Sequence, residues 1–311
     1  MKAISYRRYG GPDVLEYGER PEPKLGPDSV LVEVRAAAVN PVDWKCREGY
    51  LDGILDAVLP VIPCWDLAGV VVRPGAAVTE FAAGDEVIGY VREDFLARGT
   101  CAQYVAAPVR TLAHKPRSLG FPEAAALPLA GLTAYQVLHR VLRVRPGETV
   151  LVHTATGAVG SLAVQLARHL GARVIGAARA AGQEHIRARG GEPVTYGDDL
   201  TAQVRALVPD GVDAAFDTIG GDILRTTPTM LAPGGRLASI ADSGVTDLGG
   251  SYAFVRPDPA DLAELAGLAE QGVLTADVAR TFPLEQAADA FRHAEAGGTG
   301  GKVVIVPEPV D

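Results

Sequence analysis

Cysteine is scarce in this chain, which has three cysteines among 311 residues. Cys46, Cys64 and Cys101 are an odd number and lie far apart, so a framework of disulfide bonds is not expected. We therefore predict reduced thiols and a cytoplasmic protein. The N-terminal segment also lacks the apolar core and the cleavage site of a signal peptide, which agrees with that expectation.

Clustered positive charge and long apolar runs are also missing. The net charge is −9, and no cluster of Lys and Arg is suited to follow a phosphate backbone, which argues against a nucleic-acid partner. The most apolar stretch, 124–138, contains Pro128, Gly131 and Gln136 and is too short to span a bilayer, so no membrane partner is expected. With 48% hydrophobic and 22% charged residues, the chain has the composition of a folded soluble protein.

The first 115 residues are predicted to be rich in β-strands. Segment 30–35 alternates apolar and charged residues, as a half-buried strand does. Turn sequences such as Gly10-Gly11-Pro12 separate the apolar segments. Many short strands with frequent turns predict a barrel-like β domain.

Strands alternate with helices beyond Pro116. An apolar run of strand length at 149–153 is followed by helical spacing at 158–170, and another strand begins at 173. The alternation continues to residue 255, which predicts a parallel sheet covered on both faces. The tail from 258 has two helical stretches and a final strand at 302–306.

The strongest chemical motif is V-L-V-H-T-A-T-G-A-V-G at 150–160, between a strand and a helix. A tight turn of small residues lets backbone amides approach a pyrophosphate, and the helix N-terminus stabilises its charge. Alanine replaces the first glycine of the usual dinucleotide fingerprint, so an ordinary strand-to-helix turn is the alternative. The βαβ context favours a nucleotide. The predicted cofactor-binding residues of the turn are Ala155, Thr156, Gly157, Ala158, Val159 and Gly160.

The end of the second strand of this unit indicates which dinucleotide binds. In NAD-type units an acidic residue stands about twenty residues after the glycines and binds the adenosine ribose. This chain has Arg179 there, and no carboxylate precedes Glu184. Because arginine binds a 2′-phosphate bidentately, we predict NADPH, with a solvated loop arginine as the alternative. Tyr196, at another strand end, is predicted to support the adenosine phosphate.

The whole chain resembles the medium-chain dehydrogenase/reductase superfamily, and more narrowly its zinc-independent quinone oxidoreductases, which are similar to zeta-crystallin. The resemblance implies an α/β protein, with a GroES-like catalytic domain at 1–115 and 258–311 around a Rossmann domain, doubly wound, at 116–257. It also implies a homodimer joined through the Rossmann sheet edge at 252–255. The motifs that carry the resemblance lie at 37–43, 66–71, 84–87, 126–134, 150–160, 231–236 and 300–304.

The resemblance also argues against a metal. Zinc members hold the ion with a cysteine in the segment matching 39–43 and a histidine before an acid-x-x-Gly motif. This chain has Asn40 and Trp65 at those places, and neither supplies a thiolate or imidazole donor. Cys46 is expected to be a half-buried bystander, because a catalytic thiol needs an activating base and no histidine is near it in sequence.

Without zinc, the reaction that fits is hydride transfer to a quinone or an α,β-unsaturated carbonyl, whose anion delocalises the charge. Lys45 matches the proton-relay position of zinc members, and a surface or ribose-binding lysine is the alternative. Tyr50 is a second proton-donor candidate or a pocket wall. The predicted site comprises Asn40, Lys45 and Tyr50 as catalytic residues, Trp44 and Trp65 as walls of the substrate pocket, and Thr133 near the nicotinamide.

These observations predict an NADPH-dependent quinone or enone oxidoreductase. Two alternatives stay open. One is an enoyl-thioester reductase of lipid or polyketide metabolism, although an acidic chain does not obviously offer the basic patch that a carrier protein or coenzyme A requires. The other is an NADPH-binding stress or sensor protein with little turnover.

Overall fold

Residues 1–308 are described by the computed structural model and form two compact units. The first unit comprises Met1–Leu129 and the C-terminal segment from Arg256, and the second comprises Ala130–Val255. The first unit is therefore built from the two ends of the chain, and the second unit from the part between them. Residues 116–129, which the sequence analysis placed in the nucleotide-binding domain, belong by their contacts to the first unit. There, helix α2 (Phe121–Ala125) packs against strands β3 and β5.

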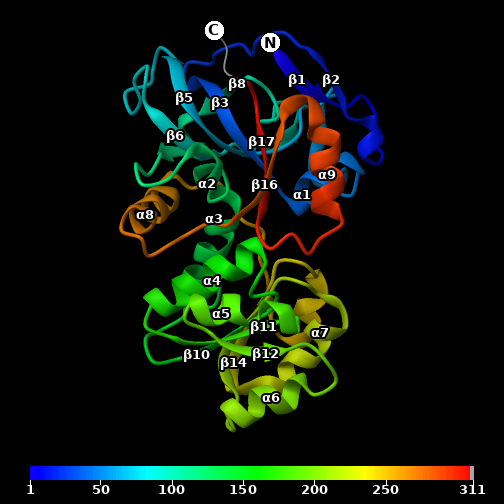
Figure 1. Cartoon of the computed structure of the whole chain (residues 1–311), viewed down its shortest axis with the longest axis vertical. Helices are drawn as coiled ribbons and strands as arrows, with labels where there is room; N and C mark the ends of the chain where they lie inside the picture. The colour runs from blue at the N-terminus through cyan, green and yellow to red at the C-terminus, as the bar shows by residue number, and fades with distance from the viewer. Residues whose placement is uncertain (309–311) are drawn as a thin grey trace. The chain divides into compact units, whose positions relative to one another are not determined.

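A seven-stranded sheet is the frame of the first unit (Figure 1). Six strands follow one path in the order β16, β17, β3, β5, β6 and β9, and β8 pairs with β3. Their bounds are Val278–Pro283 (β16), Lys302–Val306 (β17), Ser29–Val39 (β3), Asp66–Pro74 (β5), Glu86–Tyr90 (β6), Leu112–His114 (β9) and Tyr104–Pro108 (β8). Two small sheets pair β1 (Lys2–Ser5) with β2 (Glu16–Glu19) and β4 (Asp56–Ala57) with β7 (Phe95–Leu96).

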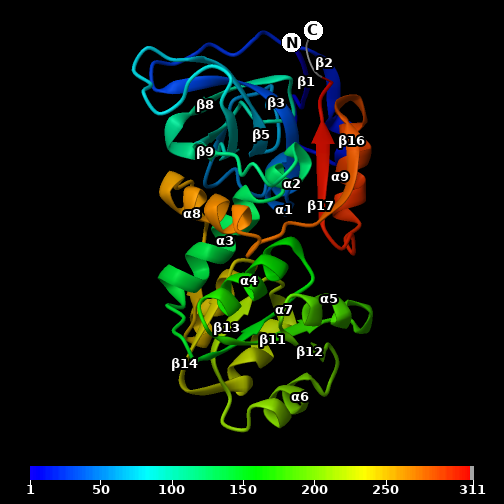
Figure 2. The same ribbon diagram turned by 60° about the vertical axis from the view of Figure 1, so that its left-hand side comes forward.

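Strand β17 joins two distant parts of the sequence. It runs antiparallel to β3, with Val303 opposite Val39, and parallel to β16. Figure 2 shows this red strand among the blue elements from the beginning of the chain. The residues at the start of β17 therefore come close to the end of β3, although more than 250 positions separate them.

Two clusters of apolar side chains stabilise this sheet. Val30, Val32 and Val34 alternate along β3 and pack into one cluster with residues of β5, β6 and β8, because every second side chain of a strand shares a face. A second cluster packs Phe291 of helix α9 (Ala287–Glu295) against β17. Each fully buried large apolar side chain contributes about 1.5–3 kcal/mol to folding.

The second unit is a six-stranded sheet in which all pairs are parallel. Numbered along the chain, its strands follow the 3-2-1-4-5-6 order of a doubly wound nucleotide-binding fold. Together with the first unit this confirms the predicted α/β class. The strands are β12 (Glu192–Thr195), β11 (Arg173–Ala178), β10 (Thr149–Val152), β13 (Val212–Asp217), β14 (Leu231–Ser239) and β15 (Ser251–Tyr252). Its helices include α4 (Ala158–His169), α5 (Gln183–Ala188), α6 (Leu200–Leu207) and α7 (Gly221–Thr226).

Three short helical segments follow one another between residues 121 and 141. Helix α2 ends at Ala125, α3 (Pro128–Gln136) follows, and a π-helical turn (Val137–Val141) continues it. Pro128 begins α3, where its missing N–H costs no helical hydrogen bond. The remaining helices are α1 (Pro41–Arg47) and α8 (Pro259–Glu270).

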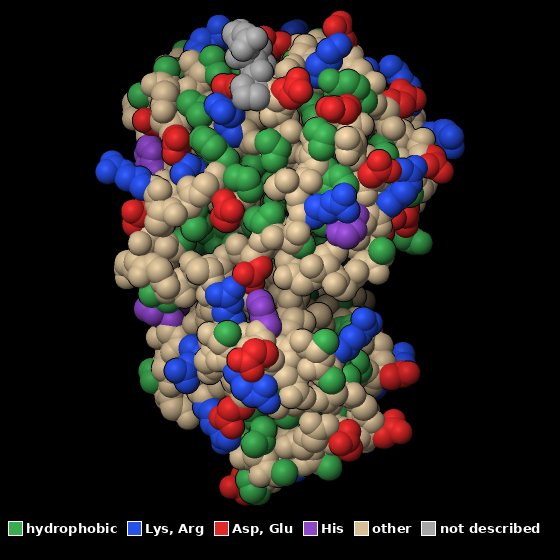
Figure 3. Space-filling view, viewed as in Figure 1, with side chains coloured by type: hydrophobic (Ala, Val, Ile, Leu, Met, Phe, Trp, Pro, Cys, Tyr) green, Lys and Arg blue, Asp and Glu red, His purple; other side chains and the backbone are tan. Residues whose placement is uncertain are grey.

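No helix among residues 1–308 is long and apolar enough to cross a membrane. On the face seen in Figure 3, basic and acidic side chains are interspersed and do not gather into one patch of either sign. That face therefore offers no continuous positive stripe of the kind that binds a nucleic-acid backbone.

Candidate active site

A buried polar network lies where β3 ends and α1 begins, in the first unit. Asn40 is the last residue before α1 and is 2% exposed. Its amide Nδ2 donates to Asp66 Oδ2 (2.9 Å) and to the carbonyl of Ala38 (3.4 Å), and its Oδ1 accepts a hydrogen bond from Lys302 Nζ. Both hydrogens of the amide are thus used within the protein.

Asp66 and Lys302 complete this network. Asp66, the first residue of β5, is fully buried and accepts a hydrogen bond from the backbone N–H of Leu129 (2.8 Å). Lys302 Nζ lies 3.4 Å from Asp66 Oδ2 and is almost as deeply buried. Burial raises the pKa of Asp66, while the Lys302 charge and the hydrogen bond from Asn40 oppose that rise. A buried carboxylate is stable only with such partners, so the pair fixes the position of Asn40.

Lys302 was not among the predicted site residues. The sequence feature that points to Lys302 is its position at the start of an otherwise apolar final strand, within G-G-K-V-V at 300–304. A lysine in such a strand needs a buried anionic partner. The sequence does not reveal that this partner is Asp66, because the two residues meet only when β17 pairs with β3 and β3 with β5.

Asp43 is a second buried carboxylate beside the network. Its Oδ2 accepts a hydrogen bond from the backbone N–H of Asn40 (2.7 Å), which caps the first turn of α1. Burial raises the pKa of Asp43 to about 7, although the Asn40 amide and the charge of Lys302 lower it. Asp43 therefore titrates near neutral pH.

Lys45 and Tyr50 lie on the exposed side of the same segment. The backbone N–H of Tyr50 donates to the carbonyl of Lys45 (2.9 Å), which places the two residues on adjacent turns of chain. Tyr50 is 74% exposed, and Lys45 is also exposed. Within residues 1–308 the ammonium of Lys45 has neither a hydrogen bond nor an ion pair. The charge is therefore available to a ligand, in contrast to that of Lys302.

The two tryptophans have different environments. Trp65 is buried and packs edge-on against Tyr90, with ring centroids 6.0 Å apart. Trp44 is half-buried and contacts the apolar cluster around Phe291. The structure thus leaves part of Trp44 accessible and encloses Trp65.

The donor atoms near this network are not arranged as a metal site. Across residues 1–308 no three His, Cys, Asp or Glu side chains form a group that could hold a metal ion. Cys46, Cys64 and Cys101 are all free thiols, and all three are buried. Cys46 is 5% exposed, so the half-buried position expected for it is wrong.

The second unit contains the predicted nucleotide turn, between β10 and α4. Gly157 is the N-cap of α4 and has extended backbone angles. A Cβ atom on Gly160 would overlap the carbonyl oxygen of Thr154, so only glycine lets the helix approach the turn this closely. The first N–H groups of a helix lack partners within it, and they carry its positive dipole end.

Two buried polar groups beside the turn have no partner among the described residues. Thr154 has a positive φ of 48°, and its backbone N–H donates to the hydroxyl of Tyr196 (2.5 Å). The hydroxyl of Thr154 and Nδ1 of His153 are buried and unpaired there. Burial lowers the pKa of His153 to about 4, so its ring is neutral at neutral pH. The backbone N–H groups at the N-terminus of α4 and the close approach that Gly160 permits suit a bound pyrophosphate, so this turn fits a dinucleotide.

The remaining predicted residues lie near that turn or within α3. Arg179 is exposed and directly follows β11. The backbone N–H of Tyr196, which directly follows β12, donates to the carbonyl of Ala178 (3.1 Å), the last residue of β11. Arg179 and Tyr196 thus follow adjacent parallel strands at the same sheet edge. Thr133 is buried in α3.

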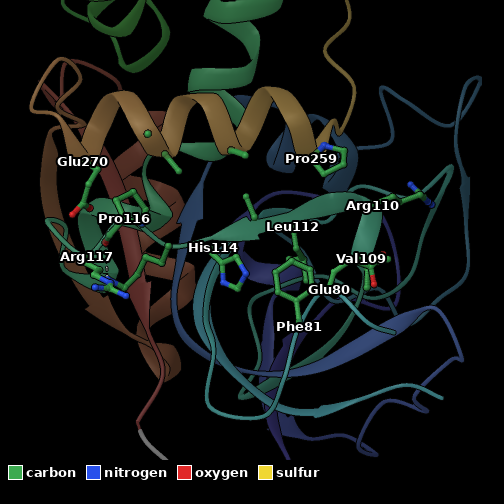
Figure 4. A pocket seen from close by; sticks show the side chains of 15 residues that line it. Glu80, Phe81, Val109, Arg110, Leu112, His114, Pro116, Arg117, Pro259 and Glu270 are labelled. Atoms are coloured by element: carbon green, nitrogen blue, oxygen red, sulfur yellow. Dashed lines mark hydrogen bonds between the residues drawn. The ribbon is translucent and has the colours of Figure 1, made fainter. Parts of the chain in front are cut away.

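A large cavity of about 840 Å³ lies elsewhere in the first unit, between α8 and β9 (Figure 4). Phe81 and Leu112 form part of its apolar wall, and His114 and Glu270 lie on its rim. None of the predicted site residues lines this cavity. It is therefore separate from the polar network of the same unit.

A doubly wound sheet with a fitted dinucleotide turn, joined in one chain to a β-rich unit, defines a class of protein, the nicotinamide-dependent oxidoreductases. Comparison with known families agrees. Residues 26–117 match the family described as "Alcohol dehydrogenase GroES-like domain", and residues 191–305 match the one described as "Zinc-binding dehydrogenase".

Individual relatives match over nearly the whole chain. An NADPH-dependent alkenal/one oxidoreductase, chloroplastic, of Arabidopsis thaliana is 36% identical over 99% of this chain and 80% of its own length. A solved quinone oxidoreductase from Coxiella burnetii is 30% identical with a TM-score of 0.87, covering 98% of this chain and 99% of its own. A solved NAD-dependent alcohol dehydrogenase is 33% identical with a TM-score of 0.89, again covering 98% and 99%. The chain therefore belongs to the medium-chain dehydrogenase/reductase superfamily, in its quinone oxidoreductase branch, and is an oxidoreductase.

Proposed function

We propose that this protein transfers hydride from NADPH to a quinone or an α,β-unsaturated carbonyl without a metal ion. The observation that carries the proposal is the network around Asn40. The residue at the place of a zinc ligand is an amide, and Asp66 and Lys302 hold it. Trp65, at the place of the second ligand, has no metal-binding atom and is buried against Tyr90. The names of the Arabidopsis thaliana and Coxiella burnetii relatives support the same substrate classes.

NADPH, when bound, supplies the hydride, and the residues of the chain must stabilise the oxygen anion that develops on the acceptor. We assign this task to Lys45, whose ammonium is exposed on α1 and unpaired within the described residues. A positively charged donor lowers the energy of an enolate or quinol anion and can also deliver the proton. Tyr50, on the next turn of chain, is the second proton-donor candidate, and the exposed part of Trp44 is the proposed wall for a flat acceptor.

Asn40, predicted as a catalytic residue, has an indirect role in this proposal. Because both its amide hydrogens are donated within the protein, it acts as a positioning residue. It fixes the start of α1, which carries Lys45 one turn further on.

The preference for NADPH over NADH is part of the proposal and rests on Arg179. This arginine is exposed where β11 ends, beside Tyr196 and near the nucleotide turn. Replacing Arg179 by aspartate is expected to move the ratio of kcat/KM values toward NADH. Arg173→Asp is the matched control, because Arg173 lies at the other end of the same strand and pairs with Glu192. An unchanged cofactor ratio in Arg179→Asp contradicts the assignment.

We also propose a cytoplasmic homodimer joined through β15, the edge strand of the second sheet. Tyr252 in this strand and Phe254 just after it are both more than 40% exposed, and an unpaired edge with apolar side chains suits pairing with a second copy. Light scattering of the wild type and of Tyr252→Lys tests this. Equal masses for the two proteins at all concentrations contradict an interface at β15.

The central experiment compares acceptors and variants. NADPH oxidation is followed with 1,4-benzoquinone, a small vinyl ketone and crotonyl thioester in parallel. Lys45→Met is expected to lower kcat/KM about 10²- to 10⁴-fold, the usual contribution of a proton-transfer group, while Lys24→Met at another exposed lysine has no effect. Unimpaired turnover in Lys45→Met removes the lysine from the mechanism. Turnover of the thioester alone supports an enoyl-thioester reductase, and tight NADPH binding without turnover supports a binding protein.

A further inference from the structure

Two of the three cysteines form a close pair in the interior of the first unit. Cys64 precedes β5 by two residues, and Cys101 lies on a segment that runs beside it. The backbone N–H of Thr100 donates to the carbonyl of Cys64 (3.0 Å), and that of Cys101 donates to the carbonyl of Pro63 (3.1 Å). These bonds hold the two side chains face to face. Their Sγ atoms are 2.8 Å apart, and both residues are at most 2% exposed.

The backbone fixes the position of Cys64. It has a φ of 68°, in the left-handed region that residues other than glycine seldom adopt. Such a conformation persists only where the surrounding structure imposes it. Because the two Sγ atoms are already 2.8 Å apart, they need to approach by less than about 1 Å to reach the 2.03–2.05 Å of a disulfide bond.

A proton acceptor and a small space lie on the other side of Cys64. The carboxyl group of Asp43 and the thiol of Cys64 lie on the same small cavity. Cys64, Asp43 and Tyr6 line a cavity of about 10 Å³, which is about the volume that one water-sized molecule requires. The hydroxyl of Tyr6 is buried and has no partner within the described residues. Cys101 is not among the residues that line this cavity.

We propose that Cys64 and Cys101 are an oxidisable dithiol, which hydrogen peroxide converts into an intrachain disulfide. Asp43 accepts the proton of Cys64 as the Cys64 sulfur attacks one peroxide oxygen and the O–O bond breaks, and the hydroxide that leaves takes that proton from Asp43 and departs as one water. The sulfur of Cys101 then attacks the sulfenic sulfur of Cys64, the S–O bond breaks, and a second water leaves. Overall two thiols lose two electrons and two protons, and one peroxide becomes two waters.

The size of the cavity limits which oxidant can reach Cys64, and the burial of its thiol limits the rate of oxidation. The space beside Cys64 is only about the size of one water molecule, which excludes a bulky disulfide such as oxidised glutathione and leaves hydrogen peroxide, a very small oxidant, as the candidate. Burial raises the pKa of the Cys64 thiol, which keeps it protonated at neutral pH. Oxidation is therefore slower than at an exposed thiolate and depends on Asp43.

Oxidation also has a consequence for α1, and this part rests on the proposed function. The disulfide moves the Cys64 sulfur and removes its thiol proton on the cavity that Cys64 shares with Asp43, and Asp43 caps the helix that carries Lys45. Reductase turnover is therefore expected to fall in the oxidised protein and to return with dithiothreitol. Unchanged turnover in fully cross-linked protein overturns this link.

The test uses the native full-length chain treated with hydrogen peroxide, then denatured and alkylated. The free-thiol count is expected to fall from three to one per chain, with Cys64 and Cys101 in one cross-linked peptide and Cys46 alkylated. Cys46 is the internal control, because it is also buried and lines the same cavity but has no thiol hydrogen-bonded to it in the described structure. Dithiothreitol is expected to restore all three thiols.

Two variants sharpen the result. Cys101→Ser is expected to leave Cys64 as a sulfenic acid that dimedone traps, and Cys46→Ser is expected to cross-link like the wild type. Retention of all three thiols in wild-type protein, or a disulfide that includes Cys46, overturns the proposal, whether or not Cys101→Ser folds. Because peptide mapping needs no enzyme activity, it decides this proposal even if the proposed reductase function fails.

Discussion

Replacing Lys302 by methionine is expected to destabilise the first unit by about 3–5 kcal/mol at neutral pH, the usual cost of removing one partner from a buried ion pair. Methionine keeps the length of the side chain but removes its charge. Asp66, which has no solvent exposure, then keeps only the donors from Asn40 and Leu129. At the 3.4 Å between Lys302 Nζ and Asp66 Oδ2, an effective dielectric constant of about 20 gives an attraction of about 5 kcal/mol, which agrees with that range.

Urea denaturation followed by tryptophan fluorescence measures this effect. The only two tryptophans, Trp44 and Trp65, both lie in the unit that contains Lys302, so their emission reports on that unit. The cost is expected to shrink as the pH falls. Burial already raises the pKa of Asp66, and removing Lys302 raises it further, so mild acid neutralises the carboxylate whose unpaired charge causes the destabilisation.

Two controls separate the ion pair from general damage to the fold. Adding Asp66→Asn to Lys302→Met removes the uncompensated charge and is expected to recover much of the lost stability. Lys24→Met, at an exposed lysine, is expected to change nothing. A loss smaller than about 1 kcal/mol for Lys302→Met at neutral pH, which is the range of a surface pair, refutes the reasoning. So does the absence of any recovery in the double variant.

Three further predictions concern the other buried groups. Burial raises the pKa of Asp43 to about 7 from 3.8, so the folded chain holds a proton that the unfolded chain releases, and stability is lost as the pH rises between these values. Urea denaturation at several pH values measures this effect. The free energy of unfolding of Asp43→Asn minus that of the wild type is expected to increase by up to about 4 kcal/mol from acid to high pH, and a difference that stays constant contradicts this. Gly160→Ala places a Cβ against the Thr154 carbonyl and is expected to weaken NADPH binding, measured by calorimetry, by at least about tenfold. Gly267→Ala, where a Cβ meets nothing, is the control, and equal affinities contradict the close approach. Tyr196→Phe leaves the Thr154 N–H without its partner, so a loss of about 1–3 kcal/mol is expected in thermal-shift assays, and an unchanged midpoint contradicts it.

The second unit was largely predictable because its signals are local. The strand expected at 149–153 is β10 (Thr149–Val152), and the helix expected at 158–170 is α4 (Ala158–His169). Apolar periodicity and the small residues of the turn act within a few positions of each other, so a pattern in the sequence translates directly into structure. The glycine that the fingerprint requires at 160 is also the one that the packing requires.

The site in the first unit was predictable only in part. The local pattern indicates segment 40–50 as part of the site, but it does not distinguish which of the side chains there are engaged inside the protein. Asn40 is held by Asp66 and Lys302, and Lys302 lies 262 positions from it in the chain. Such a partnership follows from strand pairing and not from local pattern, so Lys302 was missed.

The sequence by itself determined the order of strands and helices, the nucleotide turn, and the absence of zinc-ligand side chains at Asn40 and Trp65. These follow from side-chain chemistry and from spacing over a few residues. The tertiary structure alone decided which groups are free to act. By pairing β17 with β3 it engaged Asn40 and left Lys45 exposed, and by aligning two distant segments it brought Cys64 against Cys101. The physical reason is that burial removes water as a partner, so each buried polar group must find another group, and only the folded chain determines which one is within reach.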